Sequence, residues 1–260
     1  MTNPLIWSIT TEESVTSTSD LAKQAAAEGA PSGSGFLAFE QSEGRGRQGR
    51  HWSSKKGGMY LSVLLRPKAE KKQWFALSFA ASLAVLDTIR DQLGPHFDAQ
   101  TIPQSGLKWP NDVMIACRKI AGILLEAEGQ SIIVGIGINI ASVEVINHQA
   151  YPQKTIAPVA LADIWPQTAG DLPAPFQLAR DYMKRLDYWY NQFEQNGFTP
   201  IRDAWLTNAL FLGKTLSVRR GNSQVSGVFQ GLGMDGSLVL LDDLGRTHHI
   251  TTGEVKLLDI

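Results

Sequence analysis

The run at residues 132–140 constrains the fold more than any other part of the chain. It reads Ile-Ile-Val-Gly-Ile-Gly-Ile-Asn-Ile, which is typical of a strand buried within a sheet. Glycine weakens a strand, so Gly135 and Gly137 indicate that a ligand or another backbone comes close at these positions. Strand-like segments also dominate the stretch from Gly106 to Ile140. A sheet is therefore expected in the middle of the chain.

Helical segments are expected on both sides of this strand-rich stretch. Apolar residues recur near helical spacing in the longest of them, which Gly94-Pro95 ends. Near the N-terminus, hydroxyl side chains can cap free amides of a helix. The predicted helices run from Thr18 or Ser19 to Ala27, over 74–93, over 176–193 and over 199–206, with further strands at 36–40 and 59–65. We interpret the aromatic residues of 182–193 as packing residues rather than a base-stacking platform.

After Gly213 the pattern changes to short alternating segments. These are expected at 216–219, 225–229, 237–241, 248–251 and 255–258, with turn signals at Gly221-Asn222, Asp235-Gly236 and Leu244-Gly245. Such spacing is typical of a small barrel. His248 and His249 are adjacent, so on a strand they face opposite sides and cannot form a two-histidine metal face. We predict two domains, 1–210 and 211–260.

Residues 44–52, here called the arginine loop, read Gly-Arg-Gly-Arg-Gln-Gly-Arg-His-Trp. Glycines let a backbone approach a ligand, and arginines offer donors suited to carboxylate or phosphate, so the loop is suited to wrapping an anion. It satisfies G-x-G-x-x-G, but no helix follows and no acidic residue appears before Glu70. The phosphate-binding G-x-x-x-x-G-K-[ST] pattern also fails, because Arg50-His51 stands at its Lys-Ser/Thr position. Taken alone, the loop could equally be a solvated basic loop or a nucleic-acid patch.

Further motifs decide between these possibilities. Lys-Trp-Pro-Asn-Asp occupies 108–112, and Lys-Ile-Ala-Gly-Ile occupies 119–123. With the arginine loop and the Gly-Ile-Gly-Ile-Asn of 135–139, they resemble the biotin protein ligase family in order and spacing. Ser17-Thr18-Ser19 resembles the family's Ser-Thr-Asn element, with Ser19 in place of Asn, and Gln41 matches the glutamine before its arginine loop. The resemblance covers essentially the whole chain.

The resemblance implies an α+β fold: a mixed sheet packed with helices, as in class II synthetase-like biotin and lipoate ligases, plus a small C-terminal SH3-like barrel. It also implies an ATP-dependent, AMP-forming enzyme. Biotin and ATP would give biotinyl-5′-AMP, and the biotinyl group would pass to a lysine of a biotin carboxyl carrier protein or domain. Mg²⁺ would accompany ATP, and no structural metal is expected.

The resemblance also assigns residues to roles. Lys119, Arg47 and Arg45 would be catalytic. The implied biotin-binding residues are Ser17, Thr18, Ser19, Gln41, Gly44, Arg45, Arg47, Lys119, Gly122 and Gly137. The implied ATP and adenylate residues are Arg45, Arg47, Arg50, Trp52, Lys108, Asn111, Asp112, Lys119 and Asn139, with Asp112 as the Mg²⁺ ligand. Trp52 would pack near adenine or simply anchor the loop.

Composition and length argue against several other functions, including the DNA-binding repressor that is one alternative to a ligase. A formal net charge of −1 argues against general nucleic-acid binding, and only 16 residues precede Ser17, too few for the winged helix of a DNA-binding repressor. One cysteine, Cys117, fits a reducing compartment and is expected to fill a strand. Without a visible signal peptide or membrane-length apolar stretch, a cytoplasmic location is expected. A lipoate ligase or transferase is the alternative activity, and the sequence leaves both a monomer and a homodimer open.

Overall fold

The computed structural model describes residues 5–141, 158–221 and 223–258, so Asn222 of one expected turn lies outside the described residues. A seven-stranded sheet has the order β1-β2-β3-β7-β6-β5-β4. Its strands are β1 (Ser8–Glu12), β2 (Ser34–Ala38), β3 (Gly58–Leu65), β4 (Ser105–Lys108), β5 (Asp112–Ile115), β6 (Arg118–Glu128) and β7 (Ser131–Asn139). The pair β1–β2 is parallel and the other pairs are antiparallel. The sheet is therefore mixed, as expected, and β7 matches the predicted buried strand.

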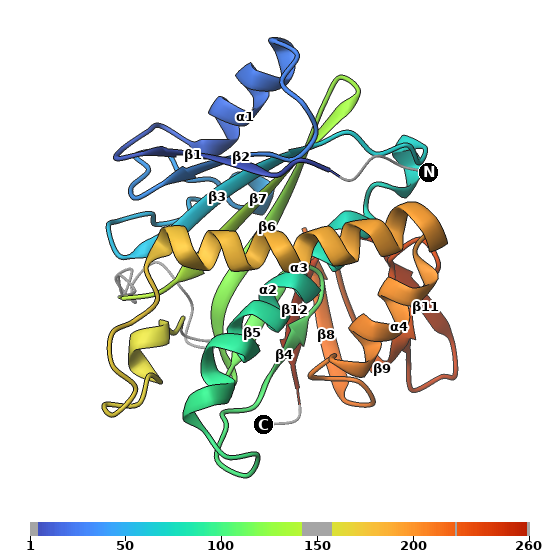
Figure 1. Ribbon diagram of the computed structural model, residues 1–260. Helices are drawn as coiled ribbons and strands as arrows, with labels where there is room; N and C mark the ends of the chain where they lie inside the picture. Colours follow the sequence, from blue (N-terminus) through green and yellow to red (C-terminus); the bar gives the residue numbers. More distant parts are fainter. Residues whose placement is uncertain (1–4, 142–157, 222, 259–260) are drawn as a thin grey trace.

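Helices cover both faces of this sheet. The first, α1 (Thr18–Ala27), packs on one face, where its Ala22 contacts Leu64 of β3 and Ile133 of β7. On the other face lie α2 (Ala76–Leu93), α3 (Pro175–Asn196) and α4 (Thr199–Thr207), and α2 and α3 cross in front of the sheet in Figure 1. Strand β3 is consequently buried along its whole length. Short 3-10 turns occur at Arg47–Gly49, Lys71–Gln73, Gly94–His96 and Leu161–Asp163.

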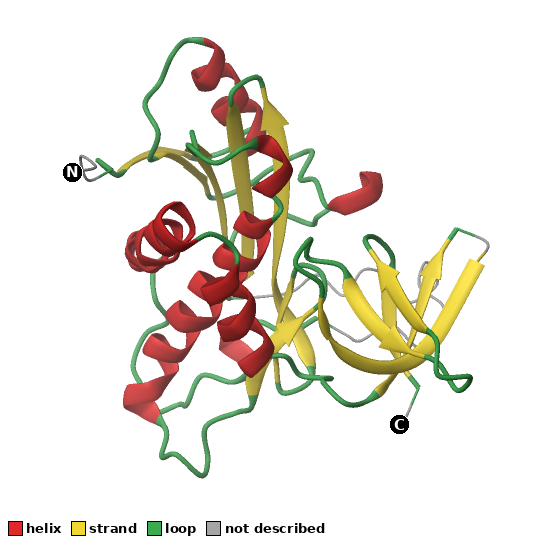
Figure 2. Ribbon diagram, turned by 90° about the vertical axis from the view of Figure 1, so that its right-hand side faces the viewer, coloured by secondary structure: helices red, strands yellow, loops and turns green. Residues whose placement is uncertain are grey.

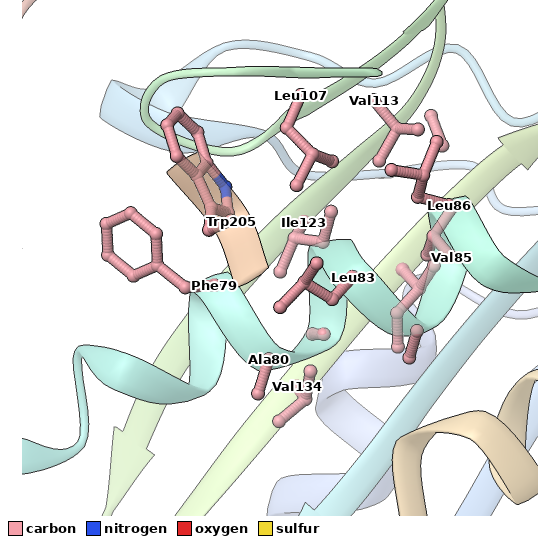
Figure 3. Packing of buried hydrophobic residues seen from close by; sticks show 14 of the residues in the cluster. Phe79, Ala80, Leu83, Val85, Leu86, Leu107, Val113, Ile123, Val134 and Trp205 are labelled. Atoms are coloured by element: carbon pink, nitrogen blue, oxygen red, sulfur yellow. The ribbon is translucent and has the colours of Figure 1, made fainter. Parts of the chain in front are cut away.

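The main core lies between the sheet and α2. Helix α2 is buried nearly all round because α3 covers the side that the sheet does not. Figure 3 shows Phe79 and Leu83 of α2 among Trp205, Val113 and Ile123. The Phe79 and Trp205 rings meet edge to face with centroids 5.6 Å apart. Truncating Leu83 to alanine would cost about 2–5 kcal/mol of stability.

Most aromatic residues of α3 serve the same core. Tyr182, Tyr190 and Phe193 are buried there, which confirms their expected packing role. Tyr188 is an exception, with 55% of its surface exposed. None of the described helices has the length and apolar composition that crossing a membrane requires.

The C-terminal residues form a separate five-stranded antiparallel sheet, as expected for an SH3-like domain (Figure 2). Its order is β11-β10-β9-β8-β12, with β8 (Thr215–Arg220), β9 (Ser223–Leu232), β10 (Leu238–Leu241), β11 (Thr247–Ile250) and β12 (Glu254–Leu257). It is tied to the rest of the molecule through Trp109, whose indole Nε1 donates to the Gly236 carbonyl at 3.0 Å. The two sheets therefore share a fixed contact.

Two expectations differ from the structure. Strand β1 was not predicted, because its Ser-Ile-Thr-Thr-Glu sequence is polar and its residues are mostly exposed at the sheet edge. Cys117 does not fill a strand: it is exposed in the two-residue turn between β5 and β6. Both turn residues have positive φ, 47° at Ala116 and 58° at Cys117. The strand ends there because the hairpin reverses direction.

Candidate active site

A cavity of about 820 Å³ lies on the face of the large sheet that carries α1. The parts of the chain that line it include the start of α1, the arginine loop, the centre of β3, the Lys-Trp-Pro-Asn-Asp segment, and the glycine-bearing centres of β6 and β7. Residues 253–255 at the C-terminal sheet line it as well. Nearly all residues that the sequence assigned to the site therefore come together in one place.

Strand register explains why these residues meet. Tyr60 of β3 pairs with Gly137 of β7, and Gly137 pairs with Gly122 of β6. The row continues from Gly122 to Asp112 of β5 and then to Lys108 of β4. Paired residues face the same side of a sheet, so this row crosses the cavity floor. The floor changes from bare backbone at its centre to charged side chains at one end.

The two glycines of the row allow an aromatic ring to lie on the backbone. A Cβ atom on Gly137 would stand 2.6 Å from ring atoms of Trp52, and one on Gly122 would stand 3.0 Å from the same indole. Any larger residue at Gly137 would displace the ring. The Trp52 indole Nε1 is buried without a hydrogen-bond partner, and Lys119 Nζ lies 5.0 Å from the ring centroid. A buried N–H group usually has a hydrogen-bond partner, and an acceptor atom of a bound ligand could supply one here.

Lys119 reaches the cavity because the pairing of β5 with β6 is irregular. Val113 pairs with Ala121, but Met114 pairs with Lys119, so Ile120 has no partner of its own. Ile120 and Ala121 consequently both join the core, and Lys119 shares the cavity face with Gly122. Regular alternation from Gly122 would have turned Lys119 to the opposite face. Such irregularities commonly re-aim a side chain.

Lys119 forms an ion pair with Asp112, with Nζ and Oδ1 2.5 Å apart. Both side chains are mostly shielded, with 29% and 17% of their surfaces exposed. An ionised carboxylate has about four lone-pair sites, so Asp112 can accept further partners besides Lys119. The neighbouring Asn111 is held by the backbone, since its Nδ2 donates to the Ile123 carbonyl at 2.6 Å. Asp112 and Asn111 thus present oxygen atoms at a fixed position.

Other cations surround this pair. Burial lowers the pKa of Lys108, an effect that Asp112 opposes. Burial also lowers the pKa of Arg47, which Asp112 again opposes, and Arg47 Nη1 lies 3.5 Å from Asn111 Oδ1. Both shifts arise because partial burial disfavours the charged forms of Lys108 and Arg47. A bound anion would stabilise these charges and offset that penalty.

The arginine loop folds back on itself as a small hairpin. The Trp52 amide donates to the Gly44 carbonyl at 2.8 Å, and the Gly46 amide donates to the Arg50 carbonyl at 2.7 Å. The three arginines then diverge. Arg47 faces Asn111, Arg50 Nη2 meets Glu254 Oε2 of the C-terminal sheet at 3.1 Å, and Arg45 pairs with Asp20 of α1.

Polar side chains gather where α1 begins. The Thr18 amide and hydroxyl both donate to Gln41 Oε1, at 2.9 and 3.1 Å, and Gln41 Nε2 donates to Ser54 Oγ at 2.7 Å. The Ser19 hydroxyl lies 3.3 Å from Ser62 Oγ. Ser17 is the N-cap residue, yet its side chain makes no capping hydrogen bond. The end of the helix is therefore capped by Gln41 and leaves the Ser17 hydroxyl to the cavity.

Asn139 has a different surrounding from the other predicted residues. It lines the cavity, but its Nδ2 donates to the Val159 carbonyl at 3.0 Å and its side chain is largely buried. Within the described ranges, no group of three or more His, Cys, Asp or Glu residues could hold a metal. Mg²⁺ that arrives with phosphate needs only one or two protein carboxylates, so Asp112 and Asn111 fit such an ion.

Sequence reasoning missed several charged residues in or beside the site. Asp20, Glu126 and Glu254 pair with loop arginines, and Arg118 lines the cavity. Asp20 carried one weak signal, because an acid in the first turn of a helix is common but can also attract a nearby cation. Glu254 carried none, since it stands 204 residues from Arg50.

The chain is similar to proteins of known family. Residues 12–141 match the biotin/lipoate A/B protein ligase family. A biotin--[acetyl-CoA-carboxylase] ligase of Paracoccus denitrificans is 35% identical over 218 residues, which cover 81% of this chain and 85% of the relative. A protein of the same name from Mycobacterium tuberculosis is 30% identical over 239 residues, covering 91% and 83%. The solved biotin protein ligase of Aquifex aeolicus in complex with biotin and ATP superposes with a TM-score of 0.78 at 27% identity, covering 96% of this chain and 97% of that one.

Proposed function

The chain belongs to the biotin/lipoate A/B protein ligase family, and we propose that it is a biotin protein ligase. In the proposed reaction, a carboxylate oxygen of biotin attacks the α-phosphorus of ATP, and pyrophosphate leaves as biotinyl-5′-AMP forms. A lysine amine of the acceptor then attacks the biotinyl carbonyl. The new amide forms, AMP leaves, and the amine loses a proton.

The row across the cavity floor is the observation that carries the proposal. Biotin combines an apolar body and a polar ureido ring with a carboxylate at the end of its chain. Gly137 and Gly122 leave apolar space on the cavity floor, which the Trp52 indole covers in this structure, and this space suits the body of biotin. Lys119 stands at the boundary with the charged end. The carboxylate and the phosphate of ATP would meet there. A cation at that point stabilises the charge that concentrates in the transition state.

The remaining cations suit the triphosphate. We assign Arg47 and Lys108 to phosphate oxygens, with Arg50 farther out, because all three line the cavity and Arg47 lies beside Asn111 whereas Arg50 reaches Glu254. When bound with ATP, Mg²⁺ supplies further neutralisation of phosphate charge, and Asp112 with Asn111 would hold it. Asp112 must then share its carboxylate between the ion and Lys119. Its fixed position beside Asn111 supports this dual role.

Polar residues at the start of α1 suit the ureido ring. Ser17, Thr18, Ser19 and Gln41 bring hydroxyl and amide groups to the cavity wall. The nearby backbone at Gly44 lies too close to Trp52 and Ser54 for any side chain to fit there. Trp52 would contact the ligand, with adenine as its proposed partner. We assign Asn139 to the adenylate only through its place in the wall, since its amide is bonded to the backbone.

The proposed acceptor is a biotin carboxyl carrier domain of a carboxylase, following the relatives' names. A cytoplasmic location would supply ATP and such an acceptor. A mixed anhydride hydrolyses in water, so the arginine loop would cover biotinyl-5′-AMP until the acceptor lysine enters.

Exchange of labelled pyrophosphate into ATP tests the proposal directly. Purified protein with Mg-ATP should catalyse exchange when biotin is added and not when it is absent. A parallel reaction with lipoate tests the related activity of the family. Exchange that lipoate stimulates and biotin does not would replace the proposed substrate, and exchange with neither acid would refute the ligase assignment.

A further inference from the structure

Arg45 makes contacts that differ from those expected of a substrate-binding cation. Its guanidinium forms a fork with the carboxylate of Asp20: Nη2 donates to Oδ1 at 2.6 Å and Nη1 donates to Oδ2 at 3.1 Å. This bidentate geometry uses the donors that a phosphate would otherwise occupy. Two of the three guanidinium nitrogens are therefore already engaged by the protein.

The third nitrogen of Arg45 faces a second carboxylate. Its Nε is buried without a hydrogen bond and lies 4.0 Å from Glu126 Oε1 on β6. The same Glu126 oxygen pairs with Lys23 of α1 at 2.5 Å. Asp20 and Lys23 are three positions apart and share a face of α1. Two carboxylates and two cations thus alternate across the helix, the loop and the sheet.

Arg47 provides an internal comparison. No carboxylate pairs directly with its guanidinium among the ion pairs of the described residues, and its Nη1 donates to the neutral Asn111 at 3.5 Å. Burial lowers the pKa of Arg47, whereas the hydrogen bond to Asp20 raises that of Arg45. Arg47 is left in need of an anion, and Arg45 already has one.

We propose that Asp20 and Glu126 hold Arg45 as the anchor of the arginine loop, so that Arg45 is a positioning residue and the anions of the reaction are met by Arg47 and Lys119. The inference rests on the proposed function for its catalytic consequence. Ser17, Thr18 and Ser19, where α1 begins, line the cavity, so the anchor fixes the loop against the end of the helix that forms part of the cavity wall. Losing the anchor would let the loop open over the adenylate.

The anchor should contribute little to global stability. The Arg45 and Asp20 side chains are 35% and 43% exposed, and ion pairs at such exposure are worth little to folding. Its effect should therefore appear in loop opening rather than in the melting temperature. This separates a positioning role from a merely structural one.

A double-mutant cycle tests the anchor. The variants are Asp20→Asn, Arg45→Gln and the pair together, with Asp20→Glu as the conservative replacement. Asp91→Asn is the matched control, because Asp91 pairs with Arg185 at 2.5 Å with similar exposure but lies on the helical face of the molecule. For each variant, kcat, KM for ATP and the biotinylation of an unrelated lysine-rich protein by escaped adenylate are measured.

The anchor predicts that both single variants raise adenylate escape by about fivefold to tenfold, the scale expected for one charge-assisted pair. The double variant should be no worse than either single variant, KM for ATP should change little, and Asp20→Glu should recover much of the loss. If Arg45→Gln raises KM for ATP or lowers kcat far more than Asp20→Asn does, and the effects multiply, Arg45 acts on the substrate. If Asp20→Asn raises adenylate escape no more than Asp91→Asn does, the anchoring role is also refuted.

A ligand-free measurement keeps this inference separate from the proposed function. Trypsin cleavage after Arg50, followed by mass spectrometry, reports how often the loop opens. Asp20→Asn and Arg45→Gln should accelerate this cleavage equally, and the double variant should match them. Absence of biotin-dependent exchange in the unaltered protein would refute the ligase assignment. The trypsin measurement would then decide alone whether Asp20 and Arg45 anchor the loop. Unchanged cleavage in an active enzyme would remove the anchor alone.

Discussion

Lys119 stands where the neutral floor of the cavity meets its cationic end, paired with Asp112. If its charge acts in the adenylation transition state, Lys119→Ala should lower biotin-dependent exchange by about 100-fold or more, as for other single electrostatic donors. Lys119→Arg is the matched variant, because it keeps the charge while changing its shape. A rate near that of the unaltered protein for Lys119→Ala, with the same circular dichroism spectrum, would assign Lys119 a structural role.

Lys108 allows a test of how much a buried charge in the site lowers the stability of the folded protein. Because burial lowers its pKa, the folded protein binds this proton more weakly than the unfolded chain does. The folded state is therefore destabilised below the folded pKa, and the penalty disappears as pH rises toward the unfolded value of about 10.4.

Lys108→Met keeps the side chain's bulk and removes the charge. It should raise stability at pH 7 by about 1 kcal/mol, or about 2–4 °C in Tm, while weakening ATP binding. The gain should shrink in melts at alkaline pH. Lys72→Met is the control, because Lys72 is 75% exposed. A gain that persists unchanged at high pH would assign the effect to packing.

The chemistry of single residues was more predictable than their partners. The motifs were sufficient to select Lys119, Arg47 and Asp112, but the orientation of Lys119 depends on the irregular pairing at Ile120, which no local pattern reveals. The Asp20 partner of Arg45 is 25 residues away in sequence. A pair of charges at that separation carries no periodic signal, so only the folded chain identifies it.

At the scale of elements, the β5–β6 hairpin carries strain close to the site. Its two turn residues, Ala116 and Cys117, both have positive φ, a conformation that glycine and asparagine tolerate better than other residues. Cys117→Gly should therefore stabilise the protein by about 0.5–1 kcal/mol in denaturant titrations. Cys117→Ala keeps a Cβ atom and should bring no such gain. Equal effects of the two substitutions would show that loss of the thiol, not relief of the backbone, is responsible.

Helices with strong periodicity were predicted almost to their ends. Helix α2 ends at Leu93, directly before the expected Gly94-Pro95 stop, and α1 begins at Thr18 as proposed. Strand boundaries were less accurate: β2 runs over Ser34–Ala38, two residues earlier than expected. The difference arises because a strand ends where its partner ends, and pairing with β1 and β3 is not written in the local sequence.

At the scale of the whole molecule, the C-terminal sheet is joined to the large sheet by the Trp109 indole. Trp109→Phe keeps a buried ring but leaves the Gly236 carbonyl without its donor. The expected cost is about 1–3 kcal/mol. Hydrogen exchange should show it as faster opening of 215–257 than of 58–139.

Trp74→Phe is the matched control for this effect. Trp74 is also buried, but its Nε1 bonds the nearby Ala69 carbonyl at 2.9 Å within one segment. Its loss should therefore leave exchange in the C-terminal sheet unchanged. Equal acceleration in both sheets for Trp109→Phe would contradict a specific link and indicate general destabilisation.

The contacts of the C-terminal sheet limit how this protein can exchange parts with its relatives. Gly236 receives the Trp109 bond and packs against the Phe75 ring, and Glu254 meets Arg50. A chimera with another protein's residues 211–260 would keep Trp109, Phe75 and Arg50. It would replace the residues of the C-terminal sheet that these three side chains contact. The two sheets look separable in Figure 2, but the residues that join them should be exchanged together. Chimeras that replace the contacting residues on both sheets should therefore fold better than chimeras that replace only one side.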